Sequence, residues 1–172
     1  GNVYLAGCFR GRPDFDPGSE TLYLPGPLGG SAIFVSKLNS SGQLVWAKKF
    51  DVSSRSGVFV AVDALGNVYL TGAFEGTVDF DPGPGLAYLT SSGNSPIHGE
   101  FDVFVLKLDR FGNLIWARQL GGDSSDTPDG LALDRDGNVY ATGTFRGIAD
   151  FDPGPYTALL DAGYKSRSVF IS

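Results

Sequence analysis

The sequence predicts an all-β fold made of repeated four-stranded antiparallel sheets, of which about two and a half are present. Three observations lead to this prediction. Long segments recur in register, the apolar segments show no helical period, and Asp/Asn-x-x-Gly turns separate those segments in pairs. The 25 glycines and 10 prolines among 172 residues suit a fold of short strands and tight turns.

Two long segments of the chain carry the repetition. GNVYLAG at Gly1 returns as GNVYLTG at Gly66 and as GNVYATG at Gly137. FVSKLNSSGQLVWAKKF, which begins at Phe34, returns as FVLKLDRFGNLIWARQL from Phe104, and the final SVFIS begins a third copy. Each unit of the fold is therefore expected to repeat the same order of strands.

The middle unit shows that order in full. A short apolar run at Gly57–Asp63 is the first expected strand, and NVYLTGAF follows it directly. FVLKL comes after a long connection and NLIWARQL is the fourth strand; both are rich in β-branched and aromatic residues. A further short strand is expected inside the long connection, at Leu86–Leu89 and again at Tyr156–Leu160.

Tight turns join these strands in pairs. Four segments share the pattern Asp/Asn-x-x-Gly: Asn39–Gly42, Asp63–Gly66, Asp109–Gly112 and Asp134–Gly137. The first side chain of each turn is expected to bond its own backbone, and the glycine to adopt the left-handed conformation. Two hairpins joined by a long connection then make one four-stranded antiparallel sheet per unit, with strands a to d.

Repeated four-stranded sheets are the blades of a β-propeller. Both faces of a blade pack on neighbouring blades, which explains strands that are apolar at consecutive positions. We expect one partial propeller domain over residues 1–172, with units at 1–56 (strands b–c–d), 57–127 (a–b–c–d) and 128–172 (a–b–c). A ring needs about four to eight blades. The expected partners are therefore the remaining blades of one polypeptide, which would make this sequence a fragment, or other copies of the chain.

The motif DFDPG occurs once per unit, at Asp14–Gly18, Asp79–Gly83 and Asp150–Gly154. In an extended segment the two aspartates point one way and the phenylalanine points the other. The phenylalanine is therefore expected to anchor the segment in the packed layer. One aspartate is expected to cap the turn, and Pro-Gly to form the central pair of a type II turn.

A calcium site is the alternative interpretation of this motif. Calcium takes about six to eight oxygen ligands, of which a D-x-D run and its carbonyls supply only a part. The candidate ligands are Asp14, Asp16, Asp79, Asp81, Asp150, Asp152 and Glu75. Arg10 and Arg146 stand where the middle copy has Glu75, and we expect them to pair with the aspartates of their own copies. A catalytic acid pair is disfavoured, because three identical motifs indicate an architectural need.

Trp46 and Trp116 occupy equivalent positions in the fourth strand of their units. Packing between blades is the first interpretation, and stacking on a sugar ring is the alternative. The acidic segment Asp123–Asp129 is expected to be a solvated loop, with calcium binding as its weaker alternative. No catalytic residue is assigned, since Cys8 and His98 are the sole residues of their kinds and form no recognisable catalytic set.

The net charge of −6 argues against binding to nucleic acid or to an anionic membrane surface, because both need a basic face. No apolar run approaches the roughly 18 residues of a membrane span. The sequence thus offers neither a nucleic-acid partner nor a segment for membrane insertion.

The repeats GNVYLTG, FVLKLDRFGNLIWARQLGG and SSDTPDGLALDRDGNVY resemble the bacterial repeat called SBBP, for seven-bladed β-propeller. The resemblance covers essentially the whole chain, although family members carry enough repeats to close a ring. It implies a structural repeat protein, secreted or attached to the bacterial cell surface. The expected function is a non-enzymatic scaffold that mediates protein or matrix interactions. A carbohydrate-binding propeller, with calcium as an assisting ion, is the alternative.

Overall fold

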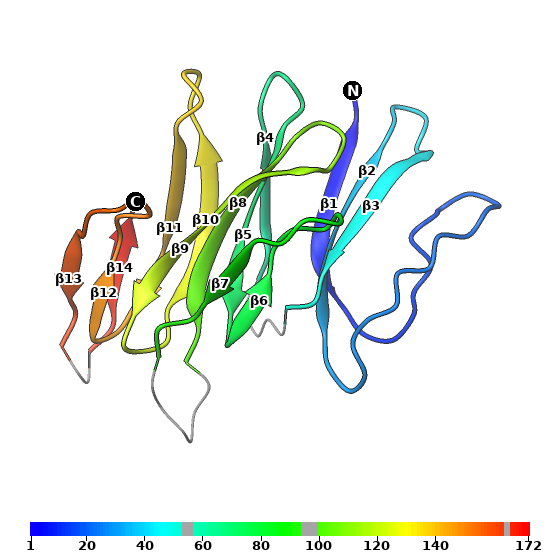
Figure 1. The fold of residues 1–172 in the computed structure, drawn as a ribbon. Helices are drawn as coiled ribbons and strands as arrows, with labels where there is room; N and C mark the ends of the chain where they lie inside the picture. Colours follow the sequence, from blue (N-terminus) through cyan, green and yellow to red (C-terminus); the bar gives the residue numbers. More distant parts are fainter. Residues whose placement is uncertain (53–56, 94–99, 164–165) are drawn as a thin grey trace.

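The computed structural model describes residues 1–52, 57–93, 100–163 and 166–172. These residues form fourteen β-strands and no helix, so none of them lies in a helix long and apolar enough to cross a membrane. Ten of the strands make three antiparallel sheets that stand side by side (Figure 1).

The three sheets follow one another along the chain, and every strand pair in them is antiparallel. The first sheet contains β1 (Val3–Phe9), β2 (Ala32–Leu38) and β3 (Leu44–Phe50). The middle sheet contains β4 (Phe59–Val62), β5 (Val68–Phe74), β8 (Asp102–Leu108) and β9 (Leu114–Gly122). The third sheet contains β10 (Thr127–Leu133), β11 (Val139–Phe145) and β14 (Ser168–Ile171).

Two short hairpins form inside the long connections. The paired strands are β6 (Thr77–Asp79) with β7 (Tyr88–Thr90), and β12 (Ile148–Asp150) with β13 (Leu159–Asp161). The strands β7 and β13 lie one to three residues further along the chain than the sequence predicts. Their partners β6 and β12 were not predicted, because each runs into the first aspartate of a DFDPG motif.

The hairpin β12–β13, which lies in the chain between β11 and β14 of the third sheet, extends the middle sheet beyond β9. Ala149 and Asp150 of β12 pair with Gly122 and Gly121 at the end of β9. The strand order is therefore β13-β12-β9-β8-β5-β4, a ladder that runs across two units of the repeat. The long connection of the last unit thus adds two strands to the sheet of the preceding unit.

The hydrophobic cores lie between the sheets. One cluster combines β2 and β3 residues such as Ile33 and Phe50 with Phe104, Leu106 and Leu108 of β8. A second cluster combines Val103 and Val105 of β8 with residues of β11, β12 and β14. Alternate residues of β8 thus enter different cores, which explains a strand that is apolar at consecutive positions.

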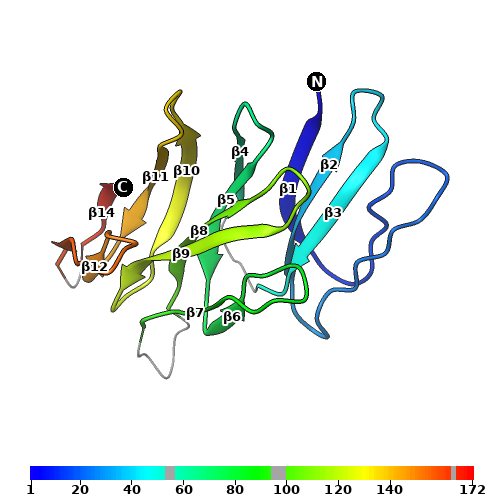
Figure 2. The same ribbon diagram turned by 45° about the horizontal axis from the view of Figure 1, so that its top comes forward.

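The innermost strands bring the three sheets together. β4 contacts both β1 and β10, and β10 also contacts β5. A second view shows the three sheets spreading from these inner strands (Figure 2). The prediction of an all-β fold of partial-propeller type is confirmed.

The four tight turns adopt the predicted conformation. Gly42, Gly66, Gly112 and Gly137 all have positive φ, between 79° and 86°. In the turn that joins β4 to β5, Oδ1 of the leading Asp63 accepts hydrogen bonds from two backbone N–H groups, each at 2.9 Å. The predictions of self-bonded turns and left-handed glycines are confirmed.

Candidate functional site

Both aspartates of each DFDPG motif accept hydrogen bonds from nearby backbone. In the middle copy, Asp79 Oδ1 accepts from the N–H groups of Asp81 at 3.0 Å and Ala87 at 2.8 Å. Asp81 Oδ1 accepts from the N–H of Gly83 at 2.7 Å. The other two copies repeat these bonds at 2.6–3.0 Å. The motif therefore closes its connection by satisfying backbone donors.

The prediction of a type II turn at Pro-Gly is wrong. Gly18, Gly83 and Gly154 are absent from the glycines with positive φ, which a type II turn requires at this place. A different constraint explains the glycine: a Cβ atom on Gly83 would lie 3.0 Å from Oδ1 of Asp81. A side chain at this position would therefore push against the carboxylate that accepts the glycine N–H.

The phenylalanine of the motif anchors the connection between sheets, as predicted. Phe80 is fully buried, and its ring centroid lies 4.7 Å from Phe104, 5.3 Å from Phe74 and 6.4 Å from Phe50. Phe50 belongs to the first sheet and the other two rings to the middle sheet. The motif thus stabilises the contact of two blades through its aromatic residue.

The calcium hypothesis for these loops stays a prediction. Oδ1 of every motif aspartate already accepts backbone N–H groups, which leaves one oxygen of each carboxylate for another ligand. No group of three or more His, Cys, Asp or Glu residues that could hold a metal occurs among the residues that the structure describes. Glu75 is exposed beside the middle copy.

The expected pairing of arginines with the motif is wrong. Arg10 and Arg146 are both exposed, and within the described ranges the recorded ion pair joins Lys49 to Asp51. The reason is that the Oδ1 atoms of the motif point back at the backbone that they close, so these carboxylates are already engaged by neutral donors.

Trp46 links the first sheet to a turn of the middle sheet. Its Nε1–H donates to the backbone carbonyl of Arg110 at 3.1 Å, and Lys37 Nζ donates to the same carbonyl at 3.2 Å. The equivalent Trp116 is partly buried, packs against the second core cluster and lies edge-on to Tyr69, with ring centroids 6.2 Å apart. The Trp46 bond and the packing of Trp116 on the second core cluster are contacts between blades, whereas the Tyr69–Trp116 contact lies within the middle sheet. Sugar stacking stays a prediction.

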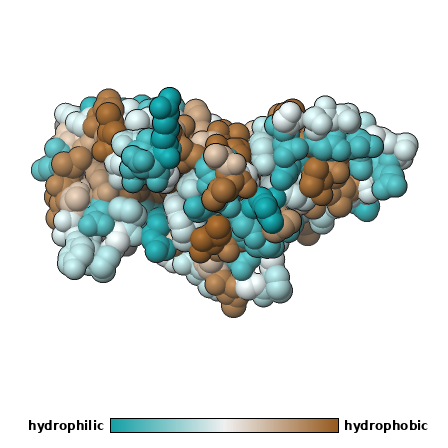
Figure 3. Space-filling view, turned by 90° about the horizontal axis from the view of Figure 1, so that it is seen from above, coloured by the Kyte–Doolittle hydropathy of each residue, from teal (hydrophilic) through white to brown (hydrophobic). Residues whose placement is uncertain are grey.

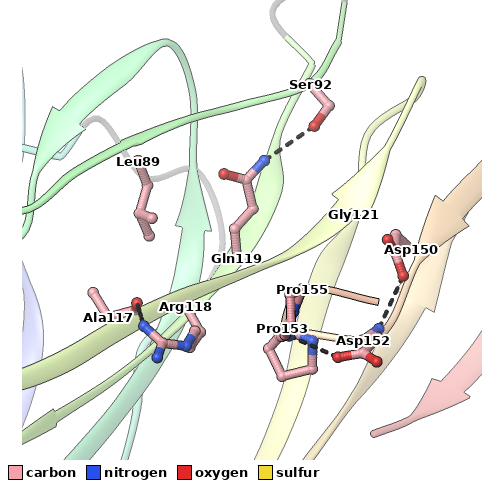
Figure 4. A pocket seen from close by; sticks show the side chains of 11 residues that line it. Leu89, Ser92, Ala117, Arg118, Gln119, Gly121, Asp150, Asp152, Pro153 and Pro155 are labelled. Carbon is pink, nitrogen blue, oxygen red and sulfur yellow. Dashed lines mark hydrogen bonds between the residues drawn. The ribbon is translucent and has the colours of Figure 1, made fainter. Parts of the chain in front are cut away.

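A groove of about 470 Å³ lies where β9 meets the loop that follows β12. Figure 4 shows its wall, where Gln119 points towards Ser92 and Asp152 lies beside Asp150. Its polar lining residues are Ser92, Arg118, Gln119, Asp150 and Asp152. The third DFDPG motif therefore forms one side of a polar groove, and the fourth strand of the preceding sheet forms the other.

Two buried carboxyl groups lie next to this groove. Asp102 opens β8 and is fully buried, and Asp126 is 1% exposed in the segment between β9 and β10. Oδ2 of Asp102 accepts from Ser92 N at 2.9 Å and from the side-chain amide of Gln119. The prediction of a solvated acidic loop is therefore wrong for Asp126, whose backbone N–H binds the carbonyl of Phe101, although Asp123 and Asp129 are exposed.

The environment of the two carboxyl groups disfavours their ionised forms. Burial raises the pKa of Asp102 to about 6, with a further contribution from Glu100. Burial also raises the pKa of Asp126 to about 7, and the negative charges of Asp102 and Asp123 add to the effect. Sequence analysis did not single out Asp102, although an acid at the head of the apolar run DVFVLKL was a usable signal.

Cys8 and His98 are the sole cysteine and histidine of the sequence. Cys8 is a free, exposed thiol on β1, and the partial burial of its sulfur raises its pKa, which lowers the thiolate fraction at neutral pH. His98 lies outside the residues that the structure describes.

Stacked antiparallel sheets with a core between each neighbouring pair define a protein of the β-propeller class. The family model named SBBP, a beta-propeller repeat, matches residues 115–144, from β9 through β11. An uncharacterised WD repeat-containing protein of Acanthamoeba polyphaga mimivirus is 29% identical over 117 residues. That match covers 63% of this chain, and the chain spans 8% of the relative's length.

Proposed function

We propose that the chain is a non-enzymatic β-propeller scaffold of a larger secreted or cell-surface bacterial protein, and that it mediates protein or matrix interactions. In this proposal residues 1–172 are one partial domain, with repeat units at 1–56, 57–127 and 128–172. The SBBP match, the propeller-class fold and the architectural use of DFDPG support it. The observation that carries it is that the outer faces of the first and third sheets expose large apolar side chains.

The outer face of the third sheet repeats a face that is buried in the middle sheet. Val103 and Val105 of β8 are 0% and 6% exposed, because the third sheet covers them. Their equivalents in β14, Val169 and Ile171, are 71% and 72% exposed. A sheet face built for packing is thus open to solvent, at an unfavourable free energy of about 1.5–3 kcal/mol for each large apolar side chain.

The outer face of the first sheet shows the same contrast. Val68 and Leu70 of β5 are fully buried against the first sheet, whereas the equivalent Val3 and Leu5 of β1 are about half exposed. Seen from above, apolar residues reach the surface in several separate patches (Figure 3). We infer that both outer faces pack on further blades, from the same polypeptide or from other copies of the chain.

Sedimentation velocity over a range of protein concentrations tests this inference. We expect the chain to associate with itself as the concentration rises, and the Ile171→Lys variant to lose that association. The matched control is Ile115→Lys, since Ile115 is 51% exposed on β9 and lies on neither outer face. A folded wild-type chain that stays monomeric at every concentration contradicts packing on other copies of the chain and leaves further blades of the same polypeptide as the partner.

The cellular location has a separate test. An antibody against the chain is applied to cell fractions of the source organism, and the proposal expects the protein in the surface or culture-medium fraction. Recovery in the cytoplasmic fraction alone contradicts a secreted scaffold.

Carbohydrate binding is the second candidate, and one observation favours it. Trp116 lines a hollow of about 280 Å³, and Arg118 and Pro153 line both this hollow and the polar groove beside it. An aromatic side chain next to polar donors and acceptors suits a sugar ring. A glycan array, read with calcium and with chelator, tests the candidate on wild type and on Trp116→Ala. Trp46→Ala is the control, and no binding to any glycan under either condition removes the candidate.

A further inference from the structure

We propose that Asp102 and Asp126 share one proton at neutral pH, and that this acid pair is a pH-sensitive latch between the middle sheet and the segment that enters the third. The inference concerns a regulatory device of the fold and goes beyond the scaffold function. It stands on the position of the two carboxyl groups, on their hydrogen bonds and on the charges around them.

The two carboxyl groups converge on one glycine. A Cβ atom on Gly121 would lie 2.8 Å from Oδ1 of Asp102 and 2.7 Å from Oδ2 of Asp126. The two oxygens therefore face the same small volume, which only a residue without a side chain leaves open. Both side chains are almost completely buried, so water does not screen one carboxylate from the other.

One oxygen of the pair is an orphan acceptor. Oδ1 of Asp102 is buried and has no hydrogen-bond partner among the residues that the structure describes, whereas Oδ2 of the same group accepts two bonds. Asp126 accepts from the backbone N–H groups of Gly122 at 3.1 Å and Arg146 at 3.3 Å. Within the described ranges, four neutral donors bind the pair and leave Oδ1 of Asp102 unsatisfied, at a cost that native structures rarely accept.

No basic side chain among the described residues forms an ion pair with either group. On the strands that pack around the pair, Arg118 Nη1 donates to the carbonyl of Ala117, and Arg146 is exposed and offers only its backbone N–H. The other charged groups nearby are acids: Glu100 before β8, Asp123 after β9, and Asp150 and Asp152 beside the groove.

A single proton resolves both problems. A carboxyl group that keeps its proton is neutral, and its O–H becomes a donor for the carboxylate next to it. Placed between Asp102 and Asp126, that proton gives the orphan oxygen its partner and halves the buried negative charge. The raised pKa values of both groups, about 6 and about 7, agree with one proton retained near pH 7.

The pair connects two blades and is not a general need of the repeat. Residues equivalent to Asp102 are Ala32 in the first sheet and Ser168 in the third, and neither carries a charge. Asp126 binds Gly122 of the middle sheet through one oxygen and Arg146, after β11 of the third sheet, through the other. Its protonation state therefore bears on this one junction.

The sign of the pH effect follows from the direction of the shifts. Both groups have a higher pKa folded than unfolded, so the folded chain binds more protons between about pH 4 and pH 7. Their stabilising contribution is complete below the unfolded pKa and is lost as the pH rises through the folded values. Each proton released on unfolding raises the unfolding equilibrium constant about tenfold per pH unit within that window.

Thermal unfolding followed by circular dichroism from pH 5 to pH 9, in chelator, tests the latch. We expect the wild-type Tm to fall from pH 5 to about pH 7 and to level off at higher pH, and the fall to shrink in Asp126→Asn and in Asp102→Asn. Asp126→Asn removes one buried charge, and its amide can donate to the orphan oxygen at every pH, although the amide nitrogen cannot accept the N–H of Gly122. The Tm of D126N should therefore depend less on pH than that of wild type. Asp123→Asn is the matched control, since Asp123 is exposed. His98→Asn controls for the histidine, whose ordinary pKa lies in the same range.

Two results overturn the proposal. The first is a wild-type pH dependence that both D102N and D126N keep unchanged. The second is a Tm at pH 8 that calcium or magnesium raises in wild type and not in D102N, because the pair then holds a metal ion and not a proton. Should either variant fail to fold, infrared spectroscopy of the wild type decides, since a shared proton gives a protonated-carboxyl C=O band at pH 7 and its absence refutes the latch.

Discussion

The phenylalanine of DFDPG supports the sharpest prediction, because the chain carries three copies in graded environments. Phe80 is fully buried, Phe151 is 7% exposed and Phe15 is only partly buried. Substitution of each by alanine removes the same atoms from three equivalent places. Any difference between the three variants therefore reports the packing around the ring and not the chemistry of the side chain.

The expected magnitude follows from that burial. Phe80→Ala removes a ring in contact with Phe50, Phe74 and Phe104 and leaves a cavity between two sheets. Such changes lower the free energy of unfolding by about 3–5 kcal/mol. For a chain of this length that corresponds to a fall in Tm of about 6–20 °C. Phe151→Ala should come close to this value, and Phe15→Ala should lower the free energy by roughly half as much.

Urea unfolding followed by tryptophan fluorescence and circular dichroism measures the three free energies. The slopes of the three transitions should match that of wild type, so that the midpoints compare directly. Equal losses in all three variants, or a smaller loss for Phe80→Ala than for Phe15→Ala, would refute the assignment of the ring to the core between sheets.

The remaining predictions concern contacts that hold the sheets and loops together. Gly72→Ala should destabilise by about 1–3 kcal/mol in urea unfolding, because its Cβ would lie 2.7 Å from the buried Phe104 ring; an unchanged midpoint would show that the ring moves freely. Trp46→Phe should lose about 1 kcal/mol by removing the donor to Arg110, and a neutral result would show that this bond adds nothing. Asp79→Ala should lose about 2 kcal/mol by orphaning two backbone N–H groups, while Asp79→Asn keeps the acceptor oxygen and should lose less than half of that; equal losses would mean that charge and not hydrogen bonding matters.

The strands and tight turns could be predicted from the sequence because their signals are local. Asp63 and Gly66 begin and end a turn whose geometry depends on its own few residues. The order of the strands could be inferred from each copy of the repeat separately. The apolar run of β8 indicated a strand covered on both faces, and the two core clusters bear this out. A signal that lies within a few residues of its structure can be interpreted without coordinates.

The errors concern contacts that depend on the approach of distant segments. The carboxylate of Asp81 binds the N–H of Gly83 and crowds the position of a side chain there. The turn type was inferred from the Pro-Gly pair alone, and that inference was wrong. Asp126 looked solvated in a polar loop, yet the loop folds over Phe101 at the start of β8. The pairing of β12 with β9 likewise depends on two units coming together, which no single repeat encodes.

The stacking of one sheet on the next is the claim on which the rest depends, and one nuclear Overhauser measurement tests it directly. The indole N–H of Trp46, on β3, should show contacts with protons of Arg110 and Phe111 in the turn between β8 and β9, because its nitrogen lies 3.1 Å from the Arg110 carbonyl oxygen. Contacts of that N–H with its own sheet alone would contradict the packed arrangement of blades.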